Sequence, residues 1–257
     1  MKQFNSRIIR NEQISVDFFE MLFTWGDSAG VPKPGQFLTF RVSQSNVPLL
    51  RRPFAFAGYD GSAGCASIIY QKRGRGTEIL SAMQPKELID VIGPLGNAFP
   101  VADNQGESVA AAGGVGLGPI LFLADNLNKR GIDTKFIFGC RSASLIPTAE
   151  SFKNASPQIC TDDGSAGFAG NVVQYINANI HTDTNTIIYG CGPVPMLKGL
   201  HTLSQSAKSQ YWASLEEMMA CGVGACMGCA IPTASGYQCA CKNGPVFNGG
   251  DIAWEQM

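Results

Sequence analysis

Four cysteines near the C-terminus constrain this chain more than any other feature. They are spaced Cys221-x4-Cys226-x2-Cys229, and Cys241 follows after eleven further residues. This is the C-x4-C-x2-C…C spacing of plant-type [2Fe–2S] sites, where one tight loop supplies three thiolates and a returning strand supplies the fourth. Glycines inside the loop would let the backbone fold closely round a cluster and turn its amides towards sulfur. These glycines are Gly222, Gly224 and Gly228.

The nature of the metal and the identity of the fourth ligand are both open to alternatives. Zinc is the main competitor, because four thiolates also bind it tetrahedrally, but zinc ligands more often come as two C-x2-C pairs and this segment has one. Cys239 and Cys241 lie two residues apart and would share a strand face. We predict Cys241 as the fourth ligand because it opens the turn Cys241–Pro245, which leaves Cys239 as a small packing residue.

Composition excludes several classes of function. The 257 residues carry a formal net charge of −1 and no run of Lys or Arg, so nucleic acid is not an expected partner. No stretch approaches the roughly 18 apolar residues of a membrane span. The N-terminus Met1–Arg7 lacks the apolar core of a signal peptide. We therefore expect a cytoplasmic protein, and in that reducing compartment crowded cysteines favour a metal site over disulfides.

The pattern of apolar runs divides the chain into three parts. Residues 1–100 hold short runs separated by turn residues, typical of a small antiparallel barrel or sandwich. These runs are Ile14–Trp25, Gln36–Val42, Phe54–Tyr59, Ala66–Gln71 and Glu87–Ile92. Residues 101–213 alternate buried-strand candidates with glycine turns or helical stretches, as a parallel α/β sheet does. These candidates are Ser108–Ala112, Lys135–Phe138, Gln158–Cys160 and Thr186–Tyr189. The linker is predicted at Pro100–Glu107, and residues 214–257, rich in Gly and Cys, form a third, small domain.

Two glycine junctions follow strands of the central domain. The strand Ser108–Ala112 runs into Gly113-Gly114-Val115-Gly116-Leu117-Gly118-Pro119, and the helical pattern Ile120–Leu127 comes next. Bare amides at a helix start form a pyrophosphate cradle, although the spacing differs from the G-x-G-x-x-G fingerprint and a structural turn is the alternative. The second junction is Gly190-Cys191-Gly192-Pro193. Cys191 alone reads as an inert buried thiol, but two glycine junctions at strand ends of one sheet favour a nucleotide crevice.

The first domain carries two weaker phosphate signals. Arg51-Arg52-Pro53-Phe54-Ala55 offers a guanidinium fork, and Gly74-Arg75-Gly76-Thr77 precedes the helical stretch Glu78–Met83. Surface arginines and an ordinary helix cap would explain either motif taken alone.

Taken in order, these motifs resemble those of the ferredoxin–NADP reductase superfamily. The segment from Ser214 to Cys226 and the turn Cys241-Lys242-Asn243-Gly244-Pro245-Val246-Phe247 narrow the likeness. They resemble the electron-transfer subunits of class B dihydroorotate dehydrogenases, and the likeness covers essentially the whole chain. It implies an N-terminal antiparallel flavin-binding β-barrel, a central parallel α/β nucleotide-binding domain and a small C-terminal [2Fe–2S] domain.

The resemblance also implies the site residues. For FAD they are Arg52, Pro53, Phe54, Ala55, Ile69, Tyr70, Gln71, Gly76 and Thr77. For the nicotinamide nucleotide they are Gly114, Gly116, Gly118, Cys191, Gly192 and Pro193, and for the cluster Cys221, Cys226, Cys229 and Cys241. The chain departs from the family at Ala55, where a hydroxyl is usual, and at Gln71, where a basic residue is common. A shift in flavin affinity or potential is expected from those two departures.

The implied activity is an electron relay in pyrimidine biosynthesis. An FMN-containing catalytic subunit, in a heterotetramer of two of each chain, would oxidise dihydroorotate, and electrons would pass through the cluster and FAD of this chain to NAD+. Flavin suits that position because it exchanges both hydride and single electrons. The alternatives are an NAD(P)H-dependent reductase subunit for another partner, of the sulfide dehydrogenase or transhydrogenase type, and a non-enzymatic zinc-bound interaction module. No residue of this chain is expected to act as a catalytic acid, base or nucleophile.

Two cofactor preferences can also be predicted. A site suited to a pyrophosphate beside Arg52 favours FAD over FMN. Asp162 and Asp163, which follow the third α/β strand, favour NAD over NADP because carboxylates accept hydrogen bonds from ribose hydroxyls and repel a 2′-phosphate. Arg141 and Ser142 oppose that preference, since Arg can hold the phosphate.

Overall fold

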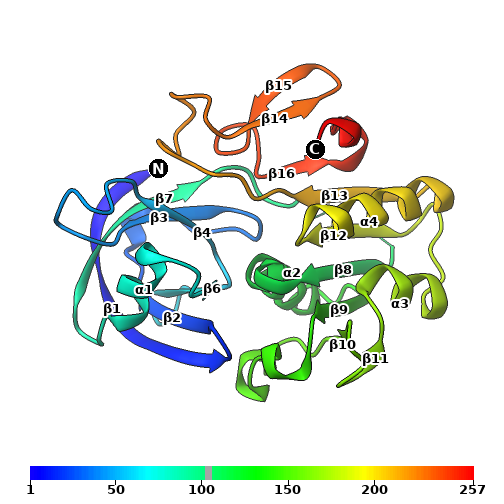
Figure 1. Cartoon of the computed structure of the whole chain (residues 1–257), viewed down its shortest axis with the longest axis horizontal. Helices are drawn as coiled ribbons and strands as arrows, with labels where there is room; N and C mark the ends of the chain where they lie inside the picture. Colours follow the sequence, from blue (N-terminus) through cyan, green and yellow to red (C-terminus); the bar gives the residue numbers. More distant parts are fainter. Residues whose placement is uncertain (102–105) are drawn as a thin grey trace.

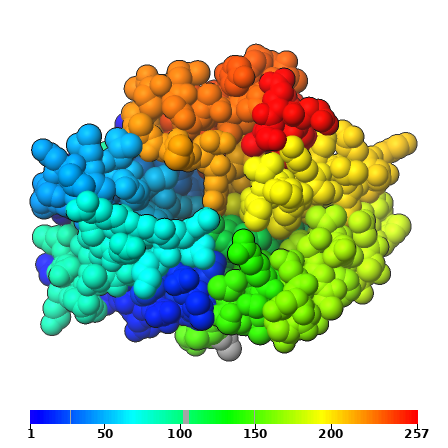
Figure 2. All heavy atoms as spheres, in the orientation of Figure 1, coloured from blue at the N-terminus to red at the C-terminus, as the bar shows by residue number. Residues whose placement is uncertain are grey.

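The computed structural model describes residues 1–101 and 106–257. It shows two lobes side by side, each built on a sheet, with the C-terminal segment lying over both (Figures 1 and 2). Residues 102–105 of the predicted linker Pro100–Glu107 lie outside the described residues. Within those that are described, no helix combines the length and apolar character that a bilayer crossing requires.

The N-terminal lobe is a curled antiparallel sheet of seven strands in the order β4-β3-β7-β1-β2-β6-β5. The curl brings β4 into contact with β6, which forms a half-barrel round an aromatic core. Its strands are β1 (Lys2–Ser15), β2 (Phe18–Thr24), β3 (Phe37–Arg41), β4 (Arg52–Ala55), β5 (Gly58–Asp60), β6 (Cys65–Gln71) and β7 (Leu88–Leu95). Helix α1 (Arg75–Ala82) connects β6 to β7, and the 3₁₀ turn η1 (Asp27–Ala29) precedes β3.

Two of the predicted N-terminal runs are divided in the structure. The run Ile14–Trp25 contains the end of β1 and all of β2, because Asp17 takes a left-handed conformation (φ 62°) and turns the chain back. The run Phe54–Tyr59 is split between β4, which pairs with β3, and β5, which pairs with β6. Most of β1 lacks an apolar run, so the sequence did not predict it.

The second lobe contains a seven-stranded sheet in the order β11-β10-β9-β8-β12-β13-β16. Every neighbouring pair is parallel except β13 and β16. Its strands are β8 (Ser108–Gly113), β9 (Thr134–Cys140), β10 (Gln158–Thr161), β11 (Phe168–Ala169), β12 (Ile187–Cys191), β13 (Gln210–Ser214) and β16 (Val246–Asn248). Its helices are α2 (Leu117–Lys129), α3 (Val172–Asn179) and α4 (Val194–Ala207), with 3₁₀ turns η2 (Gly114–Gly116), η3 (Ala143–Leu145) and η4 (Ala149–Phe152). The predicted alternation of strands and helices is therefore observed.

The C-terminal segment begins as a cysteine loop and continues as the hairpin β14 (Ala230–Thr233) and β15 (Gly236–Cys239). It then returns to the α/β sheet, where β16 pairs with β13 before the short turns η5 (Gly249–Asp251) and η6 (Trp254–Gln256). Cys229, Cys239 and Cys241 belong to the same buried cluster as Tyr211 and Trp254. The cysteine segment therefore shares its core with the central sheet, and the domain boundary at residue 214 stays a prediction.

Candidate functional site

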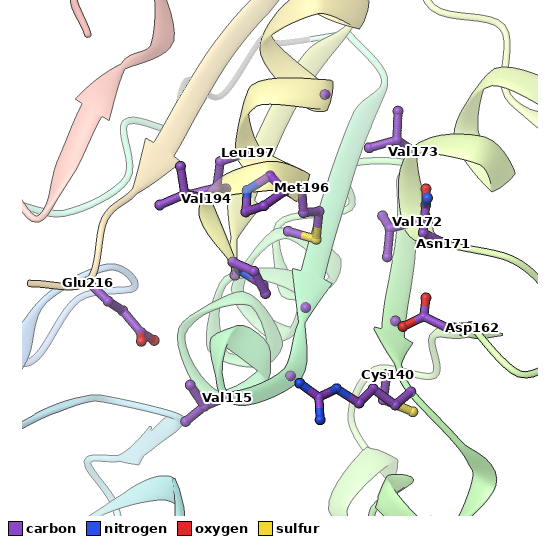
Figure 3. A pocket seen from close by; sticks show the side chains of 18 of the residues that line it. Val115, Cys140, Asp162, Asn171, Val172, Val173, Val194, Met196, Leu197 and Glu216 are labelled. Carbon is purple, nitrogen blue, oxygen red and sulfur yellow. The ribbon is translucent and has the colours of Figure 1, made fainter. Parts of the chain in front are cut away.

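A cavity of about 910 Å³ lies where the two lobes face each other (Figure 3). The half-barrel contributes Gln71 and Arg73 to its wall, and the carboxyl ends of the parallel strands contribute most of the remainder. The lining residues include Gly113, Gly114, Val115, Arg141, Asp162, Gly192, Pro193 and Glu216. This is the edge at which open α/β sheets bind nucleotides.

The two predicted glycine junctions meet in this wall. A Cβ atom at Gly116 would collide with the carbonyl of Cys191, so the turn after β8 can lie against the turn after β12 only if residue 116 is glycine. Gly114 has open space beside it but a φ of 53°, which side chains rarely adopt. The structure therefore brings the two junctions together as one bare-backbone surface beside the start of α2, suited to an anion.

Two residues predicted for the nucleotide lie behind that surface. Cys191 is buried, and burial raises the pKa of its thiol well above the ordinary value. Gly118 faces the half-barrel, where a Cβ atom would lie 3.5 Å from Cβ of Ala57. Gly114, Gly192 and Pro193 line the cavity, so the nucleotide assignments of Cys191 and Gly118 have less support from geometry than these three.

The predicted flavin motifs converge on one side of the half-barrel. A Cβ atom at Gly76 would come within 2.6 Å of Nε of Arg52, so the guanidinium packs directly on the start of α1. Arg52 also donates to the carbonyl of Leu50. The Thr77 hydroxyl accepts hydrogen bonds from the amides of Arg73 (2.9 Å) and Gly74 (3.2 Å), so it caps the helix. A guanidinium beside the first turn of α1 fits a phosphate group.

Strand β6 exposes little side chain to a ligand. Ile69 and Tyr70 are buried, and the Tyr70 hydroxyl donates to Oδ1 of Asn11 at 2.9 Å. Phe54 packs edge-on against Tyr70, with ring centroids 5.7 Å apart. Gln71 is the predicted residue of this strand that lines the cavity. Any flavin contact by Ile69 and Tyr70 would thus come through the backbone.

In the cysteine loop, backbone amides point at the predicted ligand sulfurs. Gly224 donates to Sγ of Cys241 at 3.0 Å, which joins the loop to the returning strand. The other contacts are Val223 and Ala225 to Cys221 (3.5 and 3.3 Å), Gly228 to Cys226 (3.4 Å) and Cys241 to Cys229 (3.5 Å). Amide donors of this kind stabilise thiolate ligands of iron–sulfur clusters.

The five cysteines of this segment differ in exposure and acidity. Cys226 is exposed, whereas Cys229, Cys239 and Cys241 are buried. The amide of Val223 lowers the pKa of Cys221 to about 6, and burial raises that of Cys241 to about 12, a cost that a bound metal ion would offset by deprotonating the thiol. Among the described residues, no three His, Cys, Asp or Glu side chains lie close enough to hold a single metal ion. The C-x4-C-x2-C…C spacing and the amides directed at the four sulfurs fit a [2Fe–2S] cluster.

Cys239 differs from the predicted ligands in the hydrogen bonds that its sulfur makes. Its sulfur lies 3.0 Å from Sδ of Met227, and the amide–sulfur contacts described above go to the other four cysteines. Gly224 donates to the sulfur of Cys241 and not to that of Cys239, and the choice of Cys241 as the fourth ligand stays a prediction.

Asn97, which the sequence analysis did not single out, joins the half-barrel to the cysteine segment. Its side-chain amide donates to the carbonyls of Asn243 and Val246, both at 2.9 Å, and its Oδ1 accepts from the amide of Val246 at 3.0 Å. Its own amide donates to the carbonyl of Gly244. These partners are almost 150 positions away in sequence, so no local pattern could have revealed the contact.

Glu216 is a second residue that sequence reasoning missed. Its carboxylate projects into the cavity from the chain that leaves β13, on the side opposite Asp162 (Figure 3). Solvent in the cavity reaches it, but protein surrounds it closely, and this enclosure raises the pKa of the carboxyl against the opposing charge of Arg73. Its position directly after a strand end was the available signal.

The residues predicted to choose between NAD and NADP divide into two groups. Arg141 and Asp162 both line the cavity. Asp163 instead accepts hydrogen bonds from the amide and hydroxyl of Ser165, which lower the pKa of its carboxyl. Asp162 is therefore the carboxylate placed to meet a nucleotide.

Part of the apolar set around the cysteines faces outward. Val246, Phe247 and Trp254 are buried in the core shared with the α/β sheet. Large apolar side chains of the segment remain exposed: Met218 (87%), Val223 (41%), Met227 (53%) and Tyr237 (68%).

Comparison with known proteins gives three informative similarities. Residues 216–253 match the family described as the iron-sulfur cluster binding domain of dihydroorotate dehydrogenase B. The chain is 38% identical over 227 residues, 86% of each chain, to the dihydroorotate dehydrogenase B (NAD(+)) electron transfer subunit of Geobacillus kaustophilus (strain HTA426). A solved structure of NADH-dependent reduced ferredoxin-NADP oxidoreductase superposes with a TM-score of 0.85 at 26% identity, over 98% of this chain and 90% of that one.

Proposed function

Because this chain belongs to the family of dihydroorotate dehydrogenase B electron transfer subunits, we propose that it relays electrons from a dihydroorotate-oxidising partner to NAD+. The relay runs through a [2Fe–2S] cluster and FAD held by this chain. When bound, the flavin supplies the chemistry that connects single-electron transfer to hydride transfer. The residues of the chain supply binding, orientation and electrostatics.

One spatial relation carries the proposal. The cysteine loop lies directly against the half-barrel, since a Cβ atom at Gly222 would be 3.2 Å from Cγ2 of Thr39 on β3. The nucleotide cavity lies between that half-barrel and the α/β lobe. The order cysteine loop, half-barrel, cavity matches the order of an electron path from a partner protein to a nicotinamide nucleotide.

We assign the binding roles as follows. Arg52, Gly76 and the backbone of β4 and β6 hold the flavin, with the pyrophosphate of FAD at the guanidinium and the start of α1. Gly114, Gly192 and Pro193 hold the nicotinamide nucleotide. Cys221, Cys226, Cys229 and Cys241 ligate the cluster. Replacing each of these four cysteines and Cys239 by Ser, one at a time, and measuring bound iron and sulfide tests the ligand set: Cys239→Ser should retain both.

The partner is proposed to dock over the exposed end of the cysteine loop. Cys226 is the exposed cysteine there, and Val223 and Met227 of the same loop are exposed large apolar residues. Met218 and Tyr237 of the same C-terminal segment are exposed as well. Exposed apolar side chains beside a redox site favour a protein interface. We propose an FMN-containing catalytic subunit as the partner, in a complex of two copies of each chain. Met227→Glu should weaken assembly while NADH oxidation with an artificial acceptor continues.

The decisive test is co-purification of the chain with the product of a neighbouring gene, followed by an assay of dihydroorotate oxidation by NAD+. Activity of the complex, with none from the isolated chain, would support the relay. Dihydroorotate oxidation by the isolated chain would contradict it. A colourless chain, lacking both flavin and cluster absorption, would instead support a zinc-bound interaction module.

A second candidate is an NADH-dependent reductase subunit that serves another partner. The close superposition on NADH-dependent reduced ferredoxin-NADP oxidoreductase, with a TM-score of 0.85, favours it specifically. The same complex assayed with reduced ferredoxin and NADH as electron donors and NADP+ as the acceptor would distinguish the two, because only this second candidate predicts reduction of NADP+ there.

A further inference from the structure

Cys239 is the one cysteine of the segment without a proposed ligand role, and it is held firmly in place. It pairs with Ala230 in the β14–β15 hairpin, and its amide donates to Oδ1 of Asn243 at 3.1 Å. Its carbonyl accepts from the amides of Lys242 and Asn243. The residue is only 3% exposed. The backbone thus fixes the thiol in position without help from its sulfur.

The Cys239 thiol lies near two other sulfur atoms. Its S–H donates to Sδ of Met227 at 3.0 Å. Cys239 also pairs across the hairpin with Ala230, the residue after Cys229, and the amide of Ala240 donates to the carbonyl of Cys229 at 2.9 Å, so Cys239 and Cys229 lie side by side in one buried cluster. Met227 lies between the proposed ligands Cys226 and Cys229 in the sequence. Its φ of 57° is rare for a residue other than glycine and turns the backbone sharply at that point. The single S–H of Cys239 therefore has two possible acceptors, the neutral thioether of Met227 and the sulfur of Cys229.

Which of the two sulfur atoms accepts the hydrogen bond depends on the charge of the Cys229 sulfur. A thioether is a weak neutral acceptor, whereas a metal-bound cysteine is a thiolate, and hydrogen bonds to charged acceptors are roughly twice as strong as neutral ones. Cys229 is buried like Cys239, so water does not compete for the bond. In the loaded site the S–H should turn from Met227 to Cys229.

We propose that Cys239 tunes the cluster: its thiol donates a hydrogen bond to the sulfur of Cys229 and raises the reduction potential. The inference rests on the cluster ligation of the proposed function. Reduction adds negative charge to the cluster and its sulfurs, and a donor aimed at a ligand sulfur stabilises that added charge. Cys239 is thus a positioning residue that acts through Cys229.

The test compares the full-length wild-type chain with Cys239→Ala, Cys239→Ser and the matched control Cys65→Ala. Cys65 is also a buried cysteine, but it lies on β6 of the half-barrel. Iron and sulfide content, the EPR spectrum of the reduced cluster and its midpoint potential are measured for each. We expect all four to hold the cluster, Cys239→Ala to shift to a lower potential, and Cys239→Ser and Cys65→Ala to stay closer to the wild type.

The possible outcomes separate this inference from the proposed function. A wild-type chain without iron and sulfide would contradict the cluster site itself. Loss of the cluster in Cys239→Ala would contradict the proposal and indicate that Cys239 is itself a ligand. Full cluster content with an unchanged potential would show that Cys239 donates no hydrogen bond that affects the cluster. A Met227→Leu chain provides a further check, because loss of the thioether should leave the potential nearly unchanged.

Discussion

Replacing Asn97 by Ala should loosen the attachment of the cysteine segment to the half-barrel. The substitution removes three side-chain hydrogen bonds to the turn from Asn243 to Val246. At about 1 kcal/mol each these bonds contribute about 3 kcal/mol. Water reaches the exposed Asn97 side chain and replaces part of the loss, so we expect the segment to become less stable by about 2 kcal/mol.

Amide hydrogen exchange at Leu215 measures this loss. Its amide donates to the carbonyl of Pro245 at 2.9 Å, in the turn that Asn97 holds, whereas the hydrogen bonds of Asn97 go to Asn243, Gly244 and Val246. Exchange there reports opening of the segment instead of direct exposure of a freed amide. A loss of about 2 kcal/mol corresponds to a roughly 30-fold fall in protection.

Two further variants make the measurement specific. Asn97→Asp keeps an acceptor for the Val246 amide but sets a carboxylate against two carbonyl oxygens, so protection should fall at least as far as in Asn97→Ala. Asn128→Ala, on the exposed end of α2, should leave the protection of Leu215 unchanged. If Asn97→Ala lowers the protection of Leu215 no more than Asn128→Ala does, the hydrogen bonds of Asn97 contribute nothing to the stability of the segment and the prediction is wrong.

Three other predictions follow from the cavity and its surroundings. Because enclosure raises the pKa of the Glu216 carboxyl, its ionised form destabilises the folded state at neutral pH. Glu216→Gln should therefore raise the melting temperature at neutral pH, and this gain should vanish as the pH falls below the ordinary Glu pKa of 4.5. Melting curves between about pH 4 and pH 8 would show both effects. Acid release and chromatography of the flavin should give FAD, and FMN alone would contradict the proposed pyrophosphate site at Arg52. Asp162→Ala should reduce the preference for NADH over NADPH about tenfold, the loss of one charged hydrogen bond of about 1.4 kcal/mol. Asp163→Ala, whose carboxylate is engaged with Ser165, should leave the kcat/KM ratio unchanged.

The sequence predicted those parts of the site that depend on local spacing. Three thiolates and intervening glycines specify a tight loop, and Gly222 and Gly224 do take the positive φ values, 69° and 80°, that such a loop needs. The two glycine junctions were predicted from strand–turn–helix patterns, and the sheet topology explains why they meet: β8 and β12 are neighbours in the sheet. Helix α2 begins at Leu117, earlier than expected, because Pro119 is tolerated in the first turn of a helix.

Features that depend on distant pairings could not be predicted in this way. Strand β1 has few buried side chains, so its pairing with β2 and β7 holds it more than its own pattern does. Strand β16 is three residues long and antiparallel in an otherwise parallel sheet. Asn97 and Glu216 occupy their positions because elements far apart in sequence fold together. Such contacts leave no periodic signal in a single sequence.

These distant contacts also explain why the cysteine segment needs the rest of the chain. A segment this short buries too little apolar surface to be stable alone, and metal or external packing must compensate. Here Cys229, Cys239 and Cys241 lie in a core whose other members, including Tyr211 and Leu200, come from the α/β lobe. Asn97 attaches the opposite side to the half-barrel. Because both lobes hold the segment, the sulfurs of its cysteines keep a fixed position relative to the half-barrel, while Cys226 stays exposed.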